Sequence, residues 1–144
     1  MNGANGEPSE LRYDYLVMAV GAVSNDFKTS GVSEHCLFLD SSAQAQQAKQ
    51  QITPLLRAIG KRRLSIVGAG PTGVELAAEL AKVSSKLQRY QQSTDLKITL
   101  IEAADRVLPA GPECMSQKLH KALMKQGVSI RSGTRVQRAE AGQL

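Results

Sequence analysis

A glycine-rich stretch that follows a short apolar run constrains the fold of this chain more than any other feature. Gly68, Gly70 and Gly73 have the spacing G-x-G-x-x-G, which is typical of a turn that binds the phosphates of a dinucleotide. Residues 64–67, before the turn, predict a short buried strand. Residues 74–87, after it, predict a helix with an apolar face. Strand, turn and helix in this order predict an α/β fold.

A second strand completes the unit. Residues 97–101 are apolar in alternation and end at Glu102, so the sequence predicts a Rossmann-like βαβ unit with parallel strands. A carboxylate at this position accepts hydrogen bonds from a ribose 2′-hydroxyl and repels a 2′-phosphate, which favours NAD(H) over NADP(H). Two other interpretations stay open. Arg106 can accommodate a 2′-phosphate, or Glu102 can be an exposed strand-end residue that pairs with Arg106.

Each residue type in the turn has a physical reason. Gly68 allows the chain to leave the strand in a tight turn, Gly70 allows the backbone to approach a pyrophosphate, and Gly73 allows close helix–strand packing. Pro71 suits the first turn of a helix, because its missing donor costs nothing there. The Thr72 hydroxyl can add a contact to the pyrophosphate. The candidate cofactor-binding residues of the turn are Gly68, Ala69, Gly70, Pro71, Thr72 and Gly73.

Glu75 is the candidate catalytic residue. It lies in the first turn of the expected helix, beside the phosphate site. A competing interpretation is structural, because acidic residues in a first turn also complement the helix dipole. Glu75 and Glu79 also share one stripe with Lys82 and Lys86 at helical spacing, as on a solvated helix face with a Glu–Lys pair.

Composition places the chain among globular proteins of about one domain. It has 144 residues, of which 42% are hydrophobic and 22% charged, as in an ordinary globular domain. Aromatic residues make up only 3% and there is no Trp, which argues against a base-stacking surface for nucleic acid. The one tight basic run, residues 61–63, directly precedes the expected strand. We interpret it as a solvated strand entrance.

The remaining functional residue types form no recognisable constellation. Cys36 and Cys114 are far apart and belong to no C-x-x-C pair, and His35 and His120 have no metal-ligand spacing, so no metal site is expected. No run approaches the length of a membrane helix, and no signal peptide follows Met1.

Further elements are expected on both sides of the βαβ unit. Residues 13–20 and 36–39 predict strands, and residues 134–139 can begin another. Residues 43–59 predict a polar helix that Pro54 should kink or restart. A helix is expected at 113–126, with a strand at 128–131 after the capping Gly127.

Three segments together resemble one family. YDYLVMAVGAVSNDF at 13–27 is similar to the second FAD-contacting strand and turn of two-dinucleotide flavoproteins. GVSEHCLFLDSSAQA at 31–45 resembles the connection from their FAD domain to their NAD domain. SIVGAGPTGVELAAEL at 65–80, with ITLIEAADRVLPAGPE at 98–113, resembles the NADH-binding domain. The chain therefore looks like a fragment of a bacterial type II NADH dehydrogenase, a NADH:quinone oxidoreductase of the pyridine nucleotide-disulfide oxidoreductase-like flavoproteins.

The resemblance implies roles for individual residues. The glycines of the turn would hold the NADH pyrophosphate and Glu102 the adenosine ribose. Glu75 would lie near nicotinamide and flavin, where it could orient the nicotinamide or handle a proton. Ala19 and Gly21 would lie near FAD, while Val20 replaces a Thr that many relatives have. NADH would pass a hydride to FAD, which would then reduce a quinone.

The resemblance also implies a domain division. Residues 1–40 would be the C-terminal piece of the first FAD-binding segment, 41–60 a linking helix, and 61–144 the truncated N-terminal part of the NAD(H)-binding domain. We expect this chain alone to be inactive, because the quinone site and the remaining FAD loops are absent. Relatives of full length imply the cytoplasmic face of the inner membrane, peripheral membrane contact and a possible homodimer, with no nucleic-acid partner.

Two other functions stay open at this point. A related flavin-dependent disulfide or ferredoxin reductase would share the same NAD domain, although the lack of C-x-x-C argues against small thioredoxin reductases. A truncated module that binds NAD(H) without catalysis would also carry the same motif.

Overall fold

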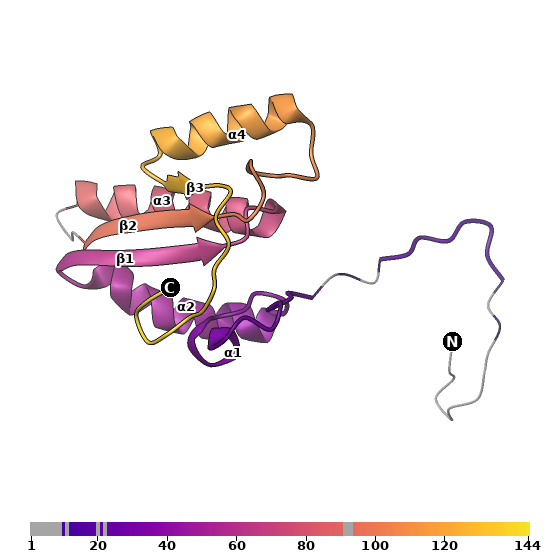
Figure 1. Cartoon of the computed structure of the whole chain (residues 1–144), viewed down its shortest axis with the longest axis horizontal. Helices are drawn as coiled ribbons and strands as arrows, with labels where there is room; N and C mark the ends of the chain where they lie inside the picture. Colours follow the sequence, from indigo (N-terminus) through magenta and orange to yellow (C-terminus); the bar gives the residue numbers. More distant parts are fainter. Residues whose placement is uncertain (1–9, 11, 20, 22, 91–93) are drawn as a thin grey trace.

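The computed structural model describes residues 10, 12–19, 21, 23–90 and 94–144. Its elements alternate between helix and strand after a short N-terminal helical turn (Figure 1). In chain order they are α1 (Val32–His35), α2 (Ser42–Arg57), β1 (Gly60–Val67), α3 (Pro71–Arg89), β2 (Thr94–Ile101), α4 (Glu113–Lys125) and β3 (Ser129–Arg131). The predicted βαβ unit is confirmed, and each of its elements is longer than the sequence pattern indicated.

The three strands form one parallel sheet in the order β1-β2-β3. Helix α3 connects β1 to β2, and helix α4 connects β2 to β3 (Figure 1). The register pairs Val67 with Ile101, and Ile101 with Arg131. All three strands therefore end at the same edge of the sheet. The predicted α/β class with parallel strands is confirmed.

One face of the sheet carries the hydrophobic core. In β2 the buried residues Leu96, Ile98 and Leu100 alternate with more exposed ones, as in a strand covered on one face. The small buried residues Ala77 and Ala81 of α3 allow that helix to lie close to the sheet. The core residues contributed by the helices and connections are Leu56, Ala69, Val74, Ala77, Ala81, Val107, Leu123 and Val128.

Strand β1 differs from the predicted buried strand. Only Ile66 of β1 is buried, Leu64 is half-buried, and Val67 is 56% exposed. The alternate residues of β1 lie on the sheet face opposite the core and are exposed. Residues 61–63 are exposed at the start of the strand, in agreement with the expected solvated entrance.

Helix α2 begins at a reciprocal capping box. The Ser41 hydroxyl accepts a hydrogen bond from the Gln44 N–H at 3.2 Å, and the Gln44 side chain accepts one from the Ser41 N–H at 3.1 Å. The helix continues through Pro54 and ends at Arg57, so the predicted restart at the proline is wrong. Pro54 lies in the last turn of the helix, so the one backbone bond that its missing N–H removes, to the Gln50 carbonyl, falls near the helix end.

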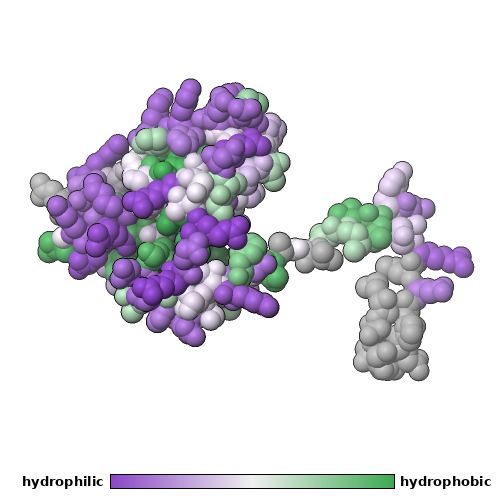
Figure 2. Space-filling view, in the orientation of Figure 1, coloured by the Kyte–Doolittle hydropathy of each residue, from purple (hydrophilic) through white to green (hydrophobic). Residues whose placement is uncertain are grey.

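The strands predicted at 13–20, 36–39 and 134–139 are not formed. Residues 12–19 and 36–39 are irregular, and Leu11 and Val20 lie outside the described residues. A strand needs a partner that accepts its backbone hydrogen bonds, and the described part of the chain offers none to these segments. The segment around residues 12–19 instead forms an extended arm with hydrophobic surface (Figure 2), on which Tyr15 is 93% and Val17 is 83% exposed.

The C-terminal segment returns across the sheet to the beginning of the fold. Instead of the strand expected at 134–139, it makes an isolated parallel bridge between Arg138 and Ser30, in which the Ala139 N–H donates to the Ser30 carbonyl at 2.8 Å. Gly31 makes this approach possible, because a Cβ at that position would overlap the Ala139 carbonyl oxygen.

Among the described helices, none combines the length and the apolar composition that crossing a membrane requires.

Candidate nucleotide-binding site

The glycine turn begins with a positive backbone angle. Gly68 has a φ of +99°, in a region that residues with side chains rarely adopt. Its N–H donates to the Ile101 carbonyl at 2.8 Å, which extends the pairing of β1 and β2 by one residue. The turn therefore leaves the sheet beside the end of β2, as the sequence predicted.

Gly73 sets how closely helix α3 approaches the turn. A Cβ at Gly73 would overlap the Gly68 carbonyl oxygen and would lie 3.6 Å from the Ile66 side chain. The predicted packing role of this glycine is confirmed by that geometry. Any side chain here would push the helix start away from the strand.

Gly70 faces open space. A Cβ built at Gly70 meets no atom within 4 Å, and its φ of −70° is ordinary. The Gly70 carbonyl accepts the first helical bond, from the Val74 N–H at 3.0 Å. No hydrogen bond within the described chain uses the N–H groups of Gly70, Thr72 or Gly73. Free N–H groups at the positive end of a helix are the arrangement that binds phosphate.

Glu102 lies directly beside the turn and contacts it. Its carboxylate oxygen Oε2 accepts a hydrogen bond from the Ala69 N–H at 2.6 Å, and Oε1 accepts one from the Ala104 N–H at 2.9 Å. Each carboxylate oxygen has a second lone pair for a further donor. The half-buried carboxylate can thus bind the turn and still receive a ribose hydroxyl.

Arg106 does not pair with Glu102. Between these two described residues there is no ion pair, so this alternative for Glu102 is wrong in the structure. The Arg106 Nη2 donates to the Pro109 carbonyl at 2.8 Å. Its Nη1 is buried and has no hydrogen-bond partner among the described residues. The guanidinium is therefore held against its own loop.

The other candidate residues at the helix start are open to solvent. Pro71, Thr72 and Glu75 are exposed. Helix α3 begins at Pro71, earlier than expected, and has no acidic residue in its first turn, so the expected first-turn position of Glu75 is wrong. On the stripe behind Glu75, Glu79 forms an exposed ion pair with Lys82 at 3.4 Å. The predicted Glu–Lys pair is confirmed, while Glu75 is left accessible near the turn.

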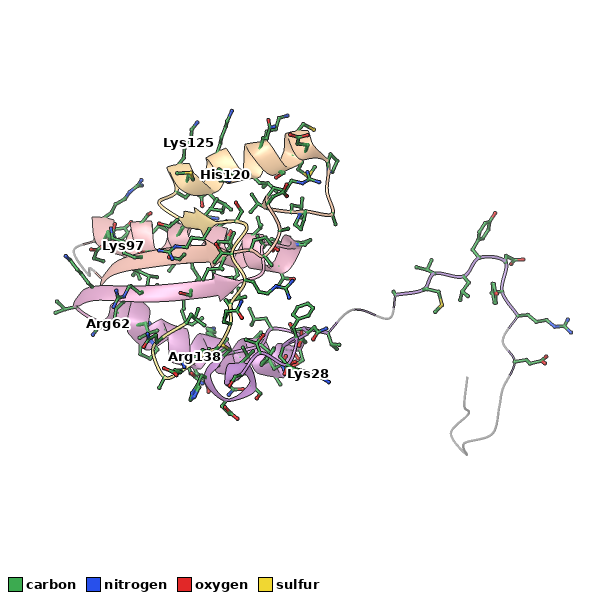
Figure 3. The ribbon with its side chains drawn as sticks, in the orientation of Figure 1. Lys28, Arg62, Lys97, His120, Lys125 and Arg138 are labelled. Atoms are coloured by element: carbon green, nitrogen blue, oxygen red, sulfur yellow. The ribbon has the colours of Figure 1, made fainter. Side chains whose placement is uncertain are left out.

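The candidate FAD residues lie apart from this site. Ala19 and Gly21 are exposed and belong to the arm rather than to the sheet, and Val20 lies outside the described residues. Figure 3 shows the arm extending away from the sheet and the helices. The described residues do not assemble around Ala19 and Gly21, so the geometry defines no FAD pocket.

A hollow of about 370 Å³ lies elsewhere, between the C-terminal segment and the strand ends. Its lining includes Ile101 and Arg131 at the strand ends and the later arginines Arg135 and Arg138. None of residues 68–73 contributes to it. The nucleotide-binding features belong to the open turn and not to this hollow.

The arrangement fits the adenosine and pyrophosphate parts of NAD(H). Free N–H groups, open space at Gly70 and a carboxylate with spare acceptor capacity meet at one edge of a parallel sheet, which is where such folds bind nucleotides. Sequence reasoning located these residues but missed the backbone contact between Glu102 and Ala69. A side-chain contact to a main-chain N–H leaves no mark in sequence spacing.

The fold and the turn define an α/β unit of the dinucleotide-binding class. The family model described as pyridine nucleotide-disulphide oxidoreductase matches residues 2–143, and the chain belongs to this family.

Similar proteins agree with this membership. The chain is 36% identical to the type II NADH:quinone oxidoreductase of Haemophilus influenzae, over 93% of this chain and 36% of that protein. It is also 36% identical to the mitochondrial external alternative NAD(P)H-ubiquinone oxidoreductase B1 of Solanum tuberosum, over 94% of this chain and 26% of that protein. The chain thus spans about a third or less of the length of these relatives.

The fold is shared with a solved structure. NDH2 of Plasmodium falciparum in complex with NADH matches 95% of this chain and 31% of its own chain, with a TM-score of 0.70 and 22% sequence identity. At this identity the likeness concerns the arrangement of strands and helices.

Proposed function

We propose that this chain contributes the NADH-binding part of a flavin-dependent NADH:quinone oxidoreductase. The observation that carries the proposal is the meeting of free N–H groups at Gly70, Thr72 and Gly73 with the Glu102 carboxylate at one sheet edge. The similarity to NADH:quinone and NAD(P)H-ubiquinone oxidoreductases supports it.

Within this proposal the turn binds the pyrophosphate and Glu102 binds the adenosine ribose. The N–H groups at the start of α3 neutralise the phosphate charge without a lysine or arginine. The Glu102 carboxylate accepts from ribose hydroxyls and repels a 2′-phosphate, so NADH is preferred over NADPH. Glu75, the fifth residue of α3, orients the nicotinamide or handles a proton nearby.

The domain division belongs to the same proposal. Residues 1–40 are a piece of the first FAD-binding segment, residues 41–60 link it, and residues 61–144 are the N-terminal part of the NAD(H)-binding domain. Ala19 and Gly21 contact FAD in the complete protein. When bound, the flavin takes up a hydride from NADH and passes electrons to a quinone.

The setting of the complete protein is also proposed. It acts at the cytoplasmic face of the inner membrane through peripheral contact, with quinone as the electron acceptor, and it can form a homodimer. The 144-residue chain alone should bind NADH without quinone-dependent turnover, because the geometry of the described residues offers no FAD pocket.

A titration of NADH fluorescence with the purified chain tests the proposal. We expect saturable binding of NADH that is tighter than binding of NADPH. Glu102→Gln should raise the Kd for NADH about tenfold and reduce the preference over NADPH, because it replaces an acceptor by a donor.

Glu79→Gln is the matched control. It neutralises an exposed carboxylate on the same helix face as Glu75, and its only described partner is Lys82. It should leave both dissociation constants unchanged. Absence of saturable NADH binding, or equal Kd values for NADH and NADPH, would contradict the proposal.

A further inference from the structure

The loop after β2 holds the centre of the glycine turn from two sides. Ala69 is fully buried. Its N–H donates to Glu102 at 2.6 Å, and its carbonyl accepts a hydrogen bond from the Leu108 N–H at 2.8 Å. Both polar groups of this one residue are therefore occupied by residues 102–108. The orientation of the free N–H groups that follow, at Gly70, Thr72 and Gly73, therefore depends on the loop at residues 102–108.

The loop itself has a strained backbone at the contact. Leu108 has a φ of +50°, and for a residue with a side chain this region costs free energy. Such a conformation persists only where the surroundings determine it. The Leu108 carbonyl accepts a hydrogen bond from the Gly111 N–H at 2.9 Å. The Leu108 side chain lies against Gly111, where a Cβ would be 2.8 Å from Cδ2 of Leu108.

Arg106 is placed to fix this conformation. Its guanidinium donates to the carbonyl of Pro109, the residue after Leu108, at 2.8 Å. The bond therefore restrains the Pro109–Ala110 peptide group, one residue beyond the strained Leu108. One guanidinium nitrogen, Nη1, is buried and has no partner in the described chain, while Nη2 makes an exposed bond to the loop. Figure 1 shows this β2–α4 connection at the carboxyl ends of the strands.

We propose that Arg106 is a positioning residue of the nucleotide site, which acts through Leu108 and Ala69 on the phosphate-binding turn. The bond to Pro109 holds Leu108 in its strained conformation, Leu108 and Glu102 hold the Ala69 peptide groups, and the turn then presents its free N–H groups to a pyrophosphate. The inference rests on the proposed binding of NADH, and it assigns Arg106 a role other than contact with a 2′-phosphate.

The first test needs no nucleotide. In Arg106→Ala, amide hydrogen exchange should become about tenfold faster at Ala69 and Leu108, because their hydrogen bonds then open locally. Exchange at Ile98 and Leu100 in the centre of the sheet should stay unchanged. Unchanged exchange at Ala69 and Leu108 would overturn the proposal.

The second test measures the dissociation constants of NADH and NADPH. Arg106→Ala should raise both by the same factor, about threefold to tenfold, since the shared pyrophosphate is affected. A loss confined to NADPH would mean that Arg106 binds the 2′-phosphate directly. A lower melting temperature with unchanged Kd values would mean a role in stability alone. Either result would overturn the proposal.

Arg62→Ala is the matched control. The Arg62 guanidinium also donates to a main-chain carbonyl, that of Lys61 at 3.1 Å, but Arg62 lies toward the opposite end of β1 (Figure 3). It should change neither the exchange nor the Kd values. If Arg106→Ala does not fold, Arg106→Lys is tested in its place, by the same measurements of amide exchange and of the Kd values for NADH and NADPH. It keeps one donor near Pro109, so smaller changes with the same pattern are expected.

The two tests separate this inference from the proposed function. If the native chain shows no saturable NADH binding, the proposed function fails. Hydrogen exchange at Ala69 in the absence of nucleotide still shows whether Arg106 holds the turn.

Discussion

At the scale of single residues, the glycines of the turn perform two separable tasks. Gly73 lies so close to the Gly68 carbonyl that no side chain fits, whereas Gly70 faces open space. Gly73 is required by the fold of the chain itself. Under the proposed function, Gly70 is required only when a pyrophosphate occupies the open space beside it. The motif thus combines a packing requirement with a binding requirement.

The two alanine variants should therefore differ. Gly70→Ala should cost at most about 1 kcal/mol of stability, from the less favourable N-cap residue, yet it should abolish most NADH binding. Gly73→Ala should cost about 1–3 kcal/mol, because the overlap forces the helix start to move. Urea unfolding and NADH titration on both variants measure this. Equal stability losses would contradict the assignment.

The two cysteines should also differ in reactivity. Burial raises the pKa of the Cys36 thiol above its usual value, while Cys114 is exposed. The reactive form is the thiolate, and a raised pKa lowers its fraction at any pH below that pKa. Iodoacetamide should modify Cys114 before Cys36 at pH 7.5, and the difference should narrow as the pH rises. Mass spectrometry of the digested protein follows both sites; faster labelling of Cys36 would be inconsistent with the burial.

At the scale of elements, those with periodic patterns were predictable and those that depend on a distant partner were not. Helix α3 and strand β2 follow from apolar spacing and from the glycines between them. The strands expected at 13–20 and 36–39 have suitable composition, but the described chain supplies no neighbouring strand. The site followed the same rule. Its residue types could be read from spacing, whereas the bonds of Ala69 to Glu102 and Leu108 depend on tertiary approach.

The capping box of α2 provides a test at this scale. Ser41→Ala removes the acceptor for the Gln44 N–H and should cost about 1 kcal/mol of stability. Ser42→Ala is the control, because Ser42 lies one residue further on, inside the helix, and should change stability by only a few tenths of a kcal/mol, as is usual for exposed sites. Thermal unfolding of both variants checks this; equal shifts would argue against the cap.

At the scale of the whole molecule, one contact joins the beginning of the described fold to its end. Gly31 has a φ of +74° and lies against the Ala139 carbonyl, whereas Gly133 has a φ of +65° and open space around it. Both glycines adopt a conformation that favours glycine, but only one also makes a close approach.

Alanine at these two glycines separates the two effects. Gly133→Ala should cost about 1–2 kcal/mol, through the backbone angle alone. Gly31→Ala should cost more, because it also pushes the C-terminal segment away from Ser30. Unfolding free energies measure the difference, and exchange of the Ala139 amide should increase only in Gly31→Ala. A smaller loss for Gly31→Ala would contradict the contact.

The bridge between Ser30 and Arg138 also determines how the molecule would respond to tension. A pull between the arm and the C-terminal end would load contacts outside the sheet first: those of Ser24 with Asp40 and of Glu140 with Gln143, and then this bridge with its bond from Ala139 to Ser30. The sheet and the turn that lies at its edge would carry no load until the bridge opens. The strands that hold the candidate site are thus mechanically shielded from forces that arrive through the ends of the described chain.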